Sequence, residues 1–206
     1  MNTETRRKPR QKRSKEKVDK ILDAVEILAT QLGLEALTTT QIAENTGFAV
    51  GTIYQYFGNR TELLIAAEER MFERLTHHLA DEVVKVLSQP VDDPIDKLIG
   101  IYIDSAKAQP GYQTLLSFSR ANKPPGANEA AVYEFTGDLI SSFIRSQIPD
   151  ITDEQIHVTM TTVVSFLSVL TDVVVLEQDP VREKRYRTEL VAHCKYALQR
   201  AAEATG

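Results

Sequence analysis

No proline occurs between Pro9 and Pro90. Proline removes a backbone donor and clashes with the preceding helical turn, so its absence leaves this stretch free to form uninterrupted helices. Apolar residues recur there at spacings of three and four, the period of one helical face, and Gly33 is placed to end the first helix. That face comprises Val18, Ile21, Leu22, Val25, Leu28 and Leu32. A second apolar face predicts a long helix over residues 60–87.

The rest of the chain has the same helical pattern, interrupted by proline and glycine. Breaks at Pro90, Pro94 and the loop 121–126 separate segments that start or end at proline, glycine or Asp/Thr caps. The predicted helices cover 94–108, 111–120, 127–147, 153–177 and 181–203. The expected fold class is therefore all-α.

Residues 158–176 are apolar enough to raise the question of a membrane span. Asp172 is the one charged residue in this stretch, whose length is near that of a transmembrane helix. Several threonines and serines interrupt it, however, and no aromatic belt flanks it. We therefore expect a helix buried inside a bundle or a dimer seam, with no membrane as a partner.

Residues 37–64 predict two short helices joined by a tight turn. Thr38 is suited to cap the first of these helices, Gly47 supplies the turn, and Val50 to Tyr56 form the second helix with Ile53 facing inward. Two short helices joined in this way form a helix-turn-helix, whose second helix fits the major groove of DNA. No acidic residue occurs over 45–61, which suits a surface that faces phosphates.

This segment resembles the TetR/AcrR family of bacterial transcriptional repressors. The resemblance covers residues 37–64 of the 206, or about fifty residues with the preceding helix, and its many fixed spacings are more specific than a helix-turn-helix pattern alone. The matching residues are Thr38-Thr39, Ile42-Ala43, Gly47, Gly51-Thr52-Ile53-Tyr54, Tyr56-Phe57, Asn59-Arg60 and Leu63-Leu64.

The resemblance implies a DNA-binding role for individual positions. It places Thr39, Thr52, Tyr54 and Arg60 at phosphates and Thr40 near a base, with Gln55 and Tyr56 facing the groove or its wall. The full set of DNA-binding candidates is Thr39, Thr40, Val50, Gly51, Thr52, Tyr54, Gln55, Tyr56 and Arg60. Ile42, Ala43, Gly47, Ile53 and Phe57 are interpreted as core and turn residues.

Two positions depart from the family pattern. Ala49 stands where a serine commonly caps the second helix, and it cannot accept that hydrogen bond, which weakens the helix start by ~1 kcal/mol. Val50 stands where a polar residue is frequent, and its side chain can touch a thymine methyl group but cannot hydrogen-bond a base. Sequence recognition is therefore expected to depend on Gln55, Thr40 and DNA shape.

The charge distribution agrees with a DNA-binding N-terminus. Residues 1–60 carry a net charge of +3 (10 basic minus 7 acidic), whereas residues 61–206 carry −8 (14 minus 22). Nine basic residues fall within 1–20 alone, and a solvated tail that only aids solubility is the competing interpretation of this charge. We expect a basic disordered arm over 1–13, a helix-turn-helix domain over 14–60 and a helical domain over 61–206. The single cysteine and the absence of a signal sequence favour the cytoplasm.

The resemblance assigns the C-terminal helices to a ligand pocket and a dimer interface. The homodimer is expected to form through 153–177 and 181–203, and double-stranded operator DNA and a small apolar or amphipathic effector are the other expected partners. Core packing is the competing interpretation of each pocket candidate. These candidates are Phe72, Tyr102, Phe118, Arg120, Tyr133, Phe135, Phe143 and Phe166.

Other functions have less support in the sequence. Glu73, His77 and Asp81 are spaced along one helical face, but such trios are usually solvated, so we expect no metal or other cofactor. A redox role for Cys194 would require its thiol to be exposed to solvent and the pKa of that thiol to be lowered. The common nucleophile and nucleotide-binding motifs are absent, so we expect no enzyme and no catalytic residue. An all-α enzyme, or an interaction module with a degenerate DNA-binding head, remain the alternatives.

Overall fold

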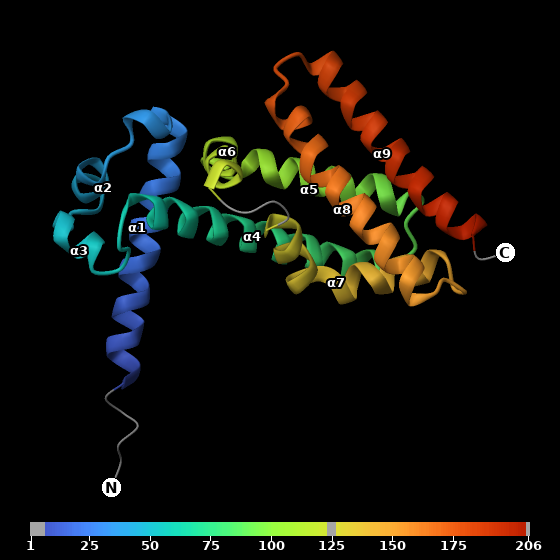
Figure 1. The fold of residues 1–206 in the computed structure, drawn as a ribbon, viewed down its shortest axis with the longest axis horizontal. Helices are drawn as coiled ribbons and strands as arrows, with labels where there is room; N and C mark the ends of the chain where they lie inside the picture. The colour runs from blue at the N-terminus through green and yellow to red at the C-terminus, as the bar shows by residue number, and fades with distance from the viewer. Residues whose placement is uncertain (1–6, 123–126, 205–206) are drawn as a thin grey trace, which may run out of the picture. The chain divides into compact units, whose positions relative to one another are not determined.

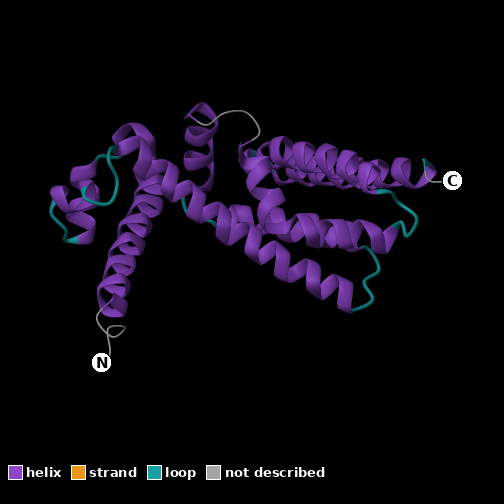
Figure 2. Ribbon diagram, turned by 60° about the horizontal axis from the view of Figure 1, so that its bottom comes forward, coloured by secondary structure: helices purple, strands orange, loops and turns teal. Residues whose placement is uncertain are grey.

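The computed structural model describes residues 7–122 and 127–204, and every regular element among them is an α-helix (Figure 2). This confirms the predicted all-α class. Figure 1 labels the helices in chain order. They are α1 (Arg7–Ala36), α2 (Thr39–Thr46), α3 (Val50–Tyr54), α4 (Arg60–Ser88), α5 (Pro94–Ala108), α6 (Tyr112–Asn122), α7 (Ala127–Gln147), α8 (Asp153–Leu176) and α9 (Pro180–Glu203).

Helix α1 differs from the expectation at both ends. It begins at Arg7, so the predicted disordered arm over 1–13 is wrong from Arg7 onward, and residues 1–6 lie outside the described part. Lysine, arginine and glutamine are good helix formers, which explains how this basic segment extends the helix. Near the other end, Gly33 has φ 71° and ψ 174°, non-helical angles that end the first helical stretch where predicted. Beyond this kink α1 resumes as far as Ala36, and Leu32 is 41% exposed instead of lying in the apolar face.

The chain divides into two compact units. The first comprises Met1–Met71 and Gln109–Asn122, and the second Phe72–Ala108 and Lys123–Gly206. The boundary therefore lies within α4 and not at residue 60 as expected. The reason is that the first turns of α4 bury Leu63, Leu64 and Met71 completely, as part of the core of the first unit.

The first unit packs α2, α3, the start of α4 and α6 around α1. Fully buried residues include Ile21 of α1, Ile42 of α2, Ile53 of α3 and Leu115 of α6. The chain approaches α1 closely at Gly111, whose φ is 71° and where a Cβ atom would lie 3.0 Å from the carbonyl oxygen of Glu26. Glycine at this position therefore allows α6 to pack against α1.

The second unit is organised around the pair α8 and α9, which run side by side (Figure 1). One core cluster joins α5, α8 and α9 through Ile103, Val174 and Leu190. Ion pairs also join α9 to α5 and to the residue just before it: Lys107–Glu183 at 2.6 Å, Arg187–Asp104 at 3.1 Å and Lys195–Asp93. These contacts fix the α8–α9 pair on the rest of the unit.

Helix α8 is the one helix in 7–122 and 127–204 that is long and apolar enough to cross a membrane. Only 35% of its most apolar window is buried within the chain. Length and composition are weak signals here, because a core helix of a soluble protein passes the same test. The helix therefore has an exposed apolar side, which includes Val158, Val169 and Leu176.

Candidate DNA-binding interface

The start of α2 is fixed by a capping box. The backbone N–H of Gln41 donates to Oγ1 of Thr38 (3.3 Å), and the backbone N–H of Thr38 donates to Oε1 of Gln41 (2.8 Å). These bonds satisfy donors that the first turn leaves free, which confirms the predicted cap. The cap places Thr39 and Thr40 in the first turn of α2.

The turn between α2 and α3 is also as predicted. Gly47 has φ 72° and ψ 16°, the left-handed conformation that glycine adopts without strain. Thr46 supports the turn, because its hydroxyl donates to the carbonyl of Ile42 (2.7 Å) and accepts from the backbone N–H of Phe48 (3.3 Å). The turn therefore sets the direction in which α3 leaves α2.

Helix α3 is shorter than expected. It ends at Tyr54 and not at Tyr56; Gln55 and Tyr56 lie in the following turn, where the backbone N–H of Tyr56 donates to the carbonyl of Ile53 (3.0 Å). Ala49 provides no side-chain cap, as predicted. Ile53 is completely buried and anchors the inner side of the helix.

The outer side of α3 is open. Gly51, Gln55 and Tyr54 are exposed, with Tyr54 at 45%, and Val50 and Thr52 are half-buried. No neighbouring atom lies within 4 Å of a Cβ atom built on Gly51, so this surface has room for a ligand backbone. The exposed side is uncharged, and Tyr54 and Gln55 give it hydrogen-bonding groups of the kind that can contact base edges or phosphates.

Two predicted phosphate contacts lie together. Oγ1 of Thr39 on α2 is 3.3 Å from the hydroxyl of Tyr54 on α3. Each hydroxyl can donate one hydrogen bond and accept others, so the pair offers adjacent donors to a single phosphate group. Thr40 is exposed beside them on the next position of α2.

Helix α1 contacts the helix-turn-helix at points that sequence reasoning missed. The hydroxyl of Ser14 donates to that of Tyr56 (3.4 Å). The ammonium groups of Lys17 and Lys20 lie 5.9 and 5.2 Å from the ring centroid of Phe48, within cation–π range. The spacing of Ser14, Lys17 and Ile21 places them on one face of α1, but this spacing alone does not indicate that the face contacts Phe48 and Tyr56.

Arg60, the predicted phosphate contact at the start of α4, also forms hydrogen bonds within the chain. Its Nε donates to the carbonyl of Leu37 (3.1 Å), and its Nη2 donates to the carbonyl of Leu34. Both carbonyls lie in the segment between the kink at Gly33 and the start of α2. The side chain that was predicted to grip a phosphate therefore ties this segment to the start of α4.

Replacing Arg60 with alanine is expected to lower the free energy of unfolding by about 1.5–3 kcal/mol, the range for hydrogen bonds from charged groups. Urea unfolding of the full chain, followed by circular dichroism, measures the loss. Thr61→Ala, a neighbouring exposed position, is the control and should change the midpoint little. An unchanged midpoint for Arg60→Ala would contradict this structural role and would leave phosphate binding as the predicted role of the side chain.

The predicted pocket residues are divided between the two units. Phe118 and Arg120 lie on α6 in the first unit, whereas Phe72, Tyr102, Phe143 and Phe166 belong to the second. Phe72 and Tyr102 are buried, so core packing accounts for them. Tyr133 and Phe135 lie outside the residues whose side chains are described.

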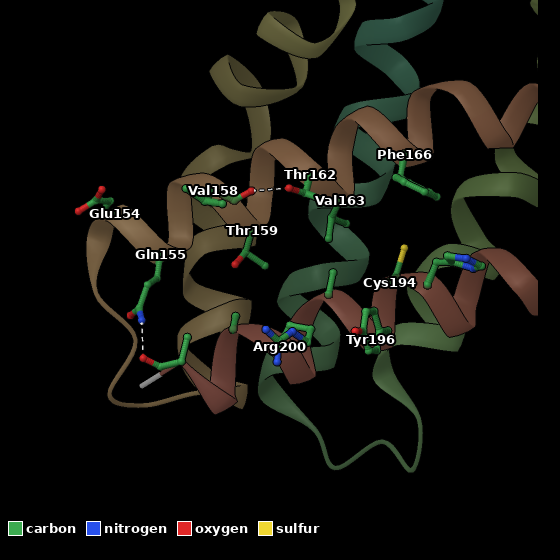
Figure 3. Close-up of a pocket in the computed structure, with 14 residues that line it drawn as sticks. Glu154, Gln155, Val158, Thr159, Thr162, Val163, Phe166, Cys194, Tyr196 and Arg200 are labelled. Atoms are coloured by element: carbon green, nitrogen blue, oxygen red, sulfur yellow. Dashed lines mark hydrogen bonds between the residues drawn. The ribbon is translucent and has the colours of Figure 1, made fainter. Parts of the chain in front are cut away.

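One of these candidates lines a surface pocket instead. Phe166 is 42% exposed and stacks on His193, with ring centroids 5.6 Å apart. The pair lines a cavity of about 600 Å³ between α8 and α9 (Figure 3). Cys194 and Arg200 also line it.

Burial raises the pKa of the Cys194 thiol to about 11, so the reactive thiolate is scarce at neutral pH and a redox role loses support.

A second cavity of about 380 Å³ lies where the end of α4 and the following loop meet α7. Phe143, Val91 and Pro94 give it an apolar wall, and Ser146 and Gln147 give it polar groups.

His77 pairs with Glu73 at 3.7 Å on the surface of α4. Over the described ranges, no three His, Cys, Asp or Glu side chains are grouped so as to hold a metal ion.

Comparison with known proteins finds relatives of the helix-turn-helix segment. Residues 21–67 match the family described as "Bacterial regulatory proteins, tetR family". The HTH-type transcriptional repressor KstR of Rhodococcus jostii is 44% identical over 61 residues, which cover 30% of this chain and 29% of KstR. The chain thus matches less than a third of the length of that relative. An uncharacterised HTH-type transcriptional regulator of Mycobacterium tuberculosis is 27% identical over 133 residues, 64% of this chain and 63% of that protein.

The fold extends the likeness to nearly the whole chain. The crystal structure of a TetR-family transcriptional regulator from Pectobacterium atrosepticum superimposes with a TM-score of 0.69 at 16% identity, over 91% of this chain and 94% of the other. The family match runs from Ile21 in α1 through α2 and α3 to Ala67 in α4, and so includes the glycine turn and the hydroxyls of Thr39 and Tyr54. Residues 21–67 thus have the sequence of the tetR family of bacterial regulatory proteins, and the chain as a whole has the fold of the TetR-family regulator from Pectobacterium atrosepticum.

Proposed function

We propose that the chain is a cytoplasmic transcriptional repressor that binds operator DNA as a homodimer and leaves it when a small molecule binds. The observation that carries the DNA-binding part is the open side of α3, bordered by the paired hydroxyls of Thr39 and Tyr54. TetR-family proteins are regulators and not enzymes, which removes the main alternative.

Binding to the DNA upstream of the chain's own gene tests this function. In fluorescence anisotropy across a salt series, a repressor binds that duplex at sub-micromolar concentration, discriminates against a scrambled duplex, and weakens steeply as salt rises. Equal and weak binding to both duplexes would favour an interaction module with a degenerate DNA-binding head.

We expect the exposed side chains of α3 and the following turn to contribute to DNA binding in two ways, by contacting phosphates or by contacting bases. Tyr54→Phe removes only the hydroxyl near Thr39 and is expected to weaken binding to operator and scrambled DNA alike, by about tenfold for a bond to a charged phosphate. Gln55→Ala is expected to cost about 1–3 kcal/mol on the operator and much less on scrambled DNA, because it removes a base contact. Anisotropy on both duplexes measures each effect. Identical behaviour of the two variants would show that these roles are misassigned.

Dimerisation through α8 and α9 is supported by an apolar stripe on the exposed side of α8. Val158, Phe166, Val169, Val173 and Leu176 are between 41% and 59% exposed and recur at helical spacing. Tyr196 of α9 is 61% exposed beside the cavity that Phe166 lines. A contiguous apolar surface of this kind is typical of a protein–protein interface. In a two-fold dimer, the two copies of α3 would fit successive major grooves about 34–36 Å apart.

The effector is proposed to be a small apolar or amphipathic molecule held by the second unit. The cavity beside Phe143 supports this, because its apolar wall is combined with Ser146 and Gln147 and its volume is in the range of small-molecule sites. An effector releases DNA only if it binds the DNA-free conformation more tightly. Release of labelled operator by a panel of hydrocarbons, phenols and fatty acids, compared between the parent chain and Phe143→Ala, tests the assignment.

A further inference from the structure

Helix α1 carries opposite charges on two of its sides. Asp19, Asp23 and Glu26 recur at spacings of four and three and face Arg70 of α4, whose guanidinium lies 2.7 Å from Asp23 and 2.8 Å from Glu26. Arg13, Lys17 and Lys20 recur at the same spacings on a different side. The acidic residues therefore have a cationic partner within the first unit, while the basic residues form a separate row.

The basic row lies beside the helix-turn-helix. The ammonium groups of Lys17 and Lys20 lie near the ring of Phe48, which stands two residues before α3. Ser14, next to Arg13, donates to the hydroxyl of Tyr56 just after α3. The row thus continues the surface of the candidate interface, and Arg13, Lys17 and Lys20 are all exposed.

The charge of this segment calls for an anionic partner. Residues 12–20 contain five basic and two acidic residues. One of the acidic residues, Asp19, is itself 3.8 Å from the guanidinium of Arg70. A regular row of long cationic side chains on a folded helix suits a repeating row of phosphates, which attracts and positions such groups without regard to base sequence.

We propose that the side of α1 carrying Arg13, Lys17 and Lys20 binds the phosphate backbone of duplex DNA next to the base pairs that α3 covers. This rests on the proposed DNA-binding function and deepens it. The N-terminal basic segment acts as a folded extension of the binding surface rather than as a flexible arm. It adds affinity for any sequence and leaves the preference for the operator to α3.

Two double variants of equal charge test the assignment. Arg13→Gln/Lys17→Gln removes two charges from the proposed side, and Lys12→Gln/Lys15→Gln removes two charges from other sides of the same helix. The salt dependence of binding is measured for each, on operator and scrambled duplexes, with full-length protein whose melting curve matches that of the parent. Arg13→Lys/Lys17→Arg serves as the conservative variant.

The first double variant is expected to reduce the slope of log K against log salt by about 1.8 per bound subunit, or about 3.6 for the homodimer, since each lost phosphate contact contributes about 0.9. Affinity should fall on the order of tenfold for both duplexes alike, with the ratio between them unchanged. The second double variant should change the slope by less than half as much, and the conservative variant should keep the parent slope.

Three outcomes would overturn the proposal: a parent slope for Arg13→Gln/Lys17→Gln, equal losses in the two double variants, or a loss confined to the operator. Equal losses would indicate an effect of net charge and not of this side of α1. If the parent chain bound neither duplex, the proposed function itself would fail. That result is distinct from a parent that binds and a variant that binds equally well.

Discussion

Replacing Arg70 with methionine is expected to lower the free energy of unfolding of the first unit by about 3–5 kcal/mol, the usual cost of breaking a buried ion pair from one side. The side chain of Arg70 is 16% exposed, and its guanidinium lies 2.8 Å from Oε1 of Glu26, whose side chain is 5% exposed. It also donates to the carbonyl of Asp19 at 2.9 Å. The variant keeps most of the side-chain volume but leaves the buried carboxylate of Glu26 without this cation.

The partner variant distinguishes a charge effect from a packing effect. Glu26→Gln in the Arg70→Met background should recover part of the loss, because the carboxylate that needed the cation is gone. Thermal and urea unfolding of all four proteins complete the cycle. Arg200→Met is the control, since Arg200 (62% exposed) pairs with Glu203 (48% exposed) at the surface of α9 and its loss should change the melting temperature little. Strictly additive losses for Arg70 and Glu26 would contradict the coupling.

Local sequence signals identified most of the fold. Apolar spacing together with proline and glycine placed α4, α5, α7, α8 and α9 within about one residue of their observed ends. Thr38 and Gly47 were identified because a cap and a left-handed turn depend on the residue itself and its immediate neighbours. For the same reason the exposed residues of α3 could be named before any contact was known.

Long-range contacts explain what local signals could not provide. The carbonyl partners of Arg60 lie 23 and 26 residues away in the chain, so nothing local distinguishes them from a phosphate. The addition of α6 to the first unit depends on the close approach of Gly111 to Glu26. The helical start of α1 was missed because a basic composition was read as disorder, although the same residues have high helix propensity. The scatter of the pocket candidates over both units has the same origin, since aromatic residues at helical spacing mostly mark core.

Replacing Val169 with glutamate is expected to convert the dimer into a monomer and to weaken operator binding by about 100-fold or more, the range by which joining two binding modules raises affinity. Val169 lies in the middle of the apolar stripe of α8 and is 58% exposed. A two-fold interface places each substitution on both subunits, so two carboxylates would be buried against an apolar surface. Light scattering coupled to size exclusion gives the mass, and anisotropy gives the affinity.

The control for this variant is Val84→Glu, which makes the same change at a 49%-exposed valine of α4 that lies outside the α8 stripe and its cavity. It should remain a dimer with parental operator affinity. A dimeric Val169→Glu protein would move the interface away from α8. A monomeric variant that still bound a half-operator as well as the parent does would show that α1, α2 and α3 remain intact. The loss on the full operator would then come from the missing second copy and not from damage to the DNA-binding surface. Because the stripe of α8 and the open side of α3 belong to different units, the mass tests the dimer and the affinity for a half-operator tests the DNA contact of one subunit.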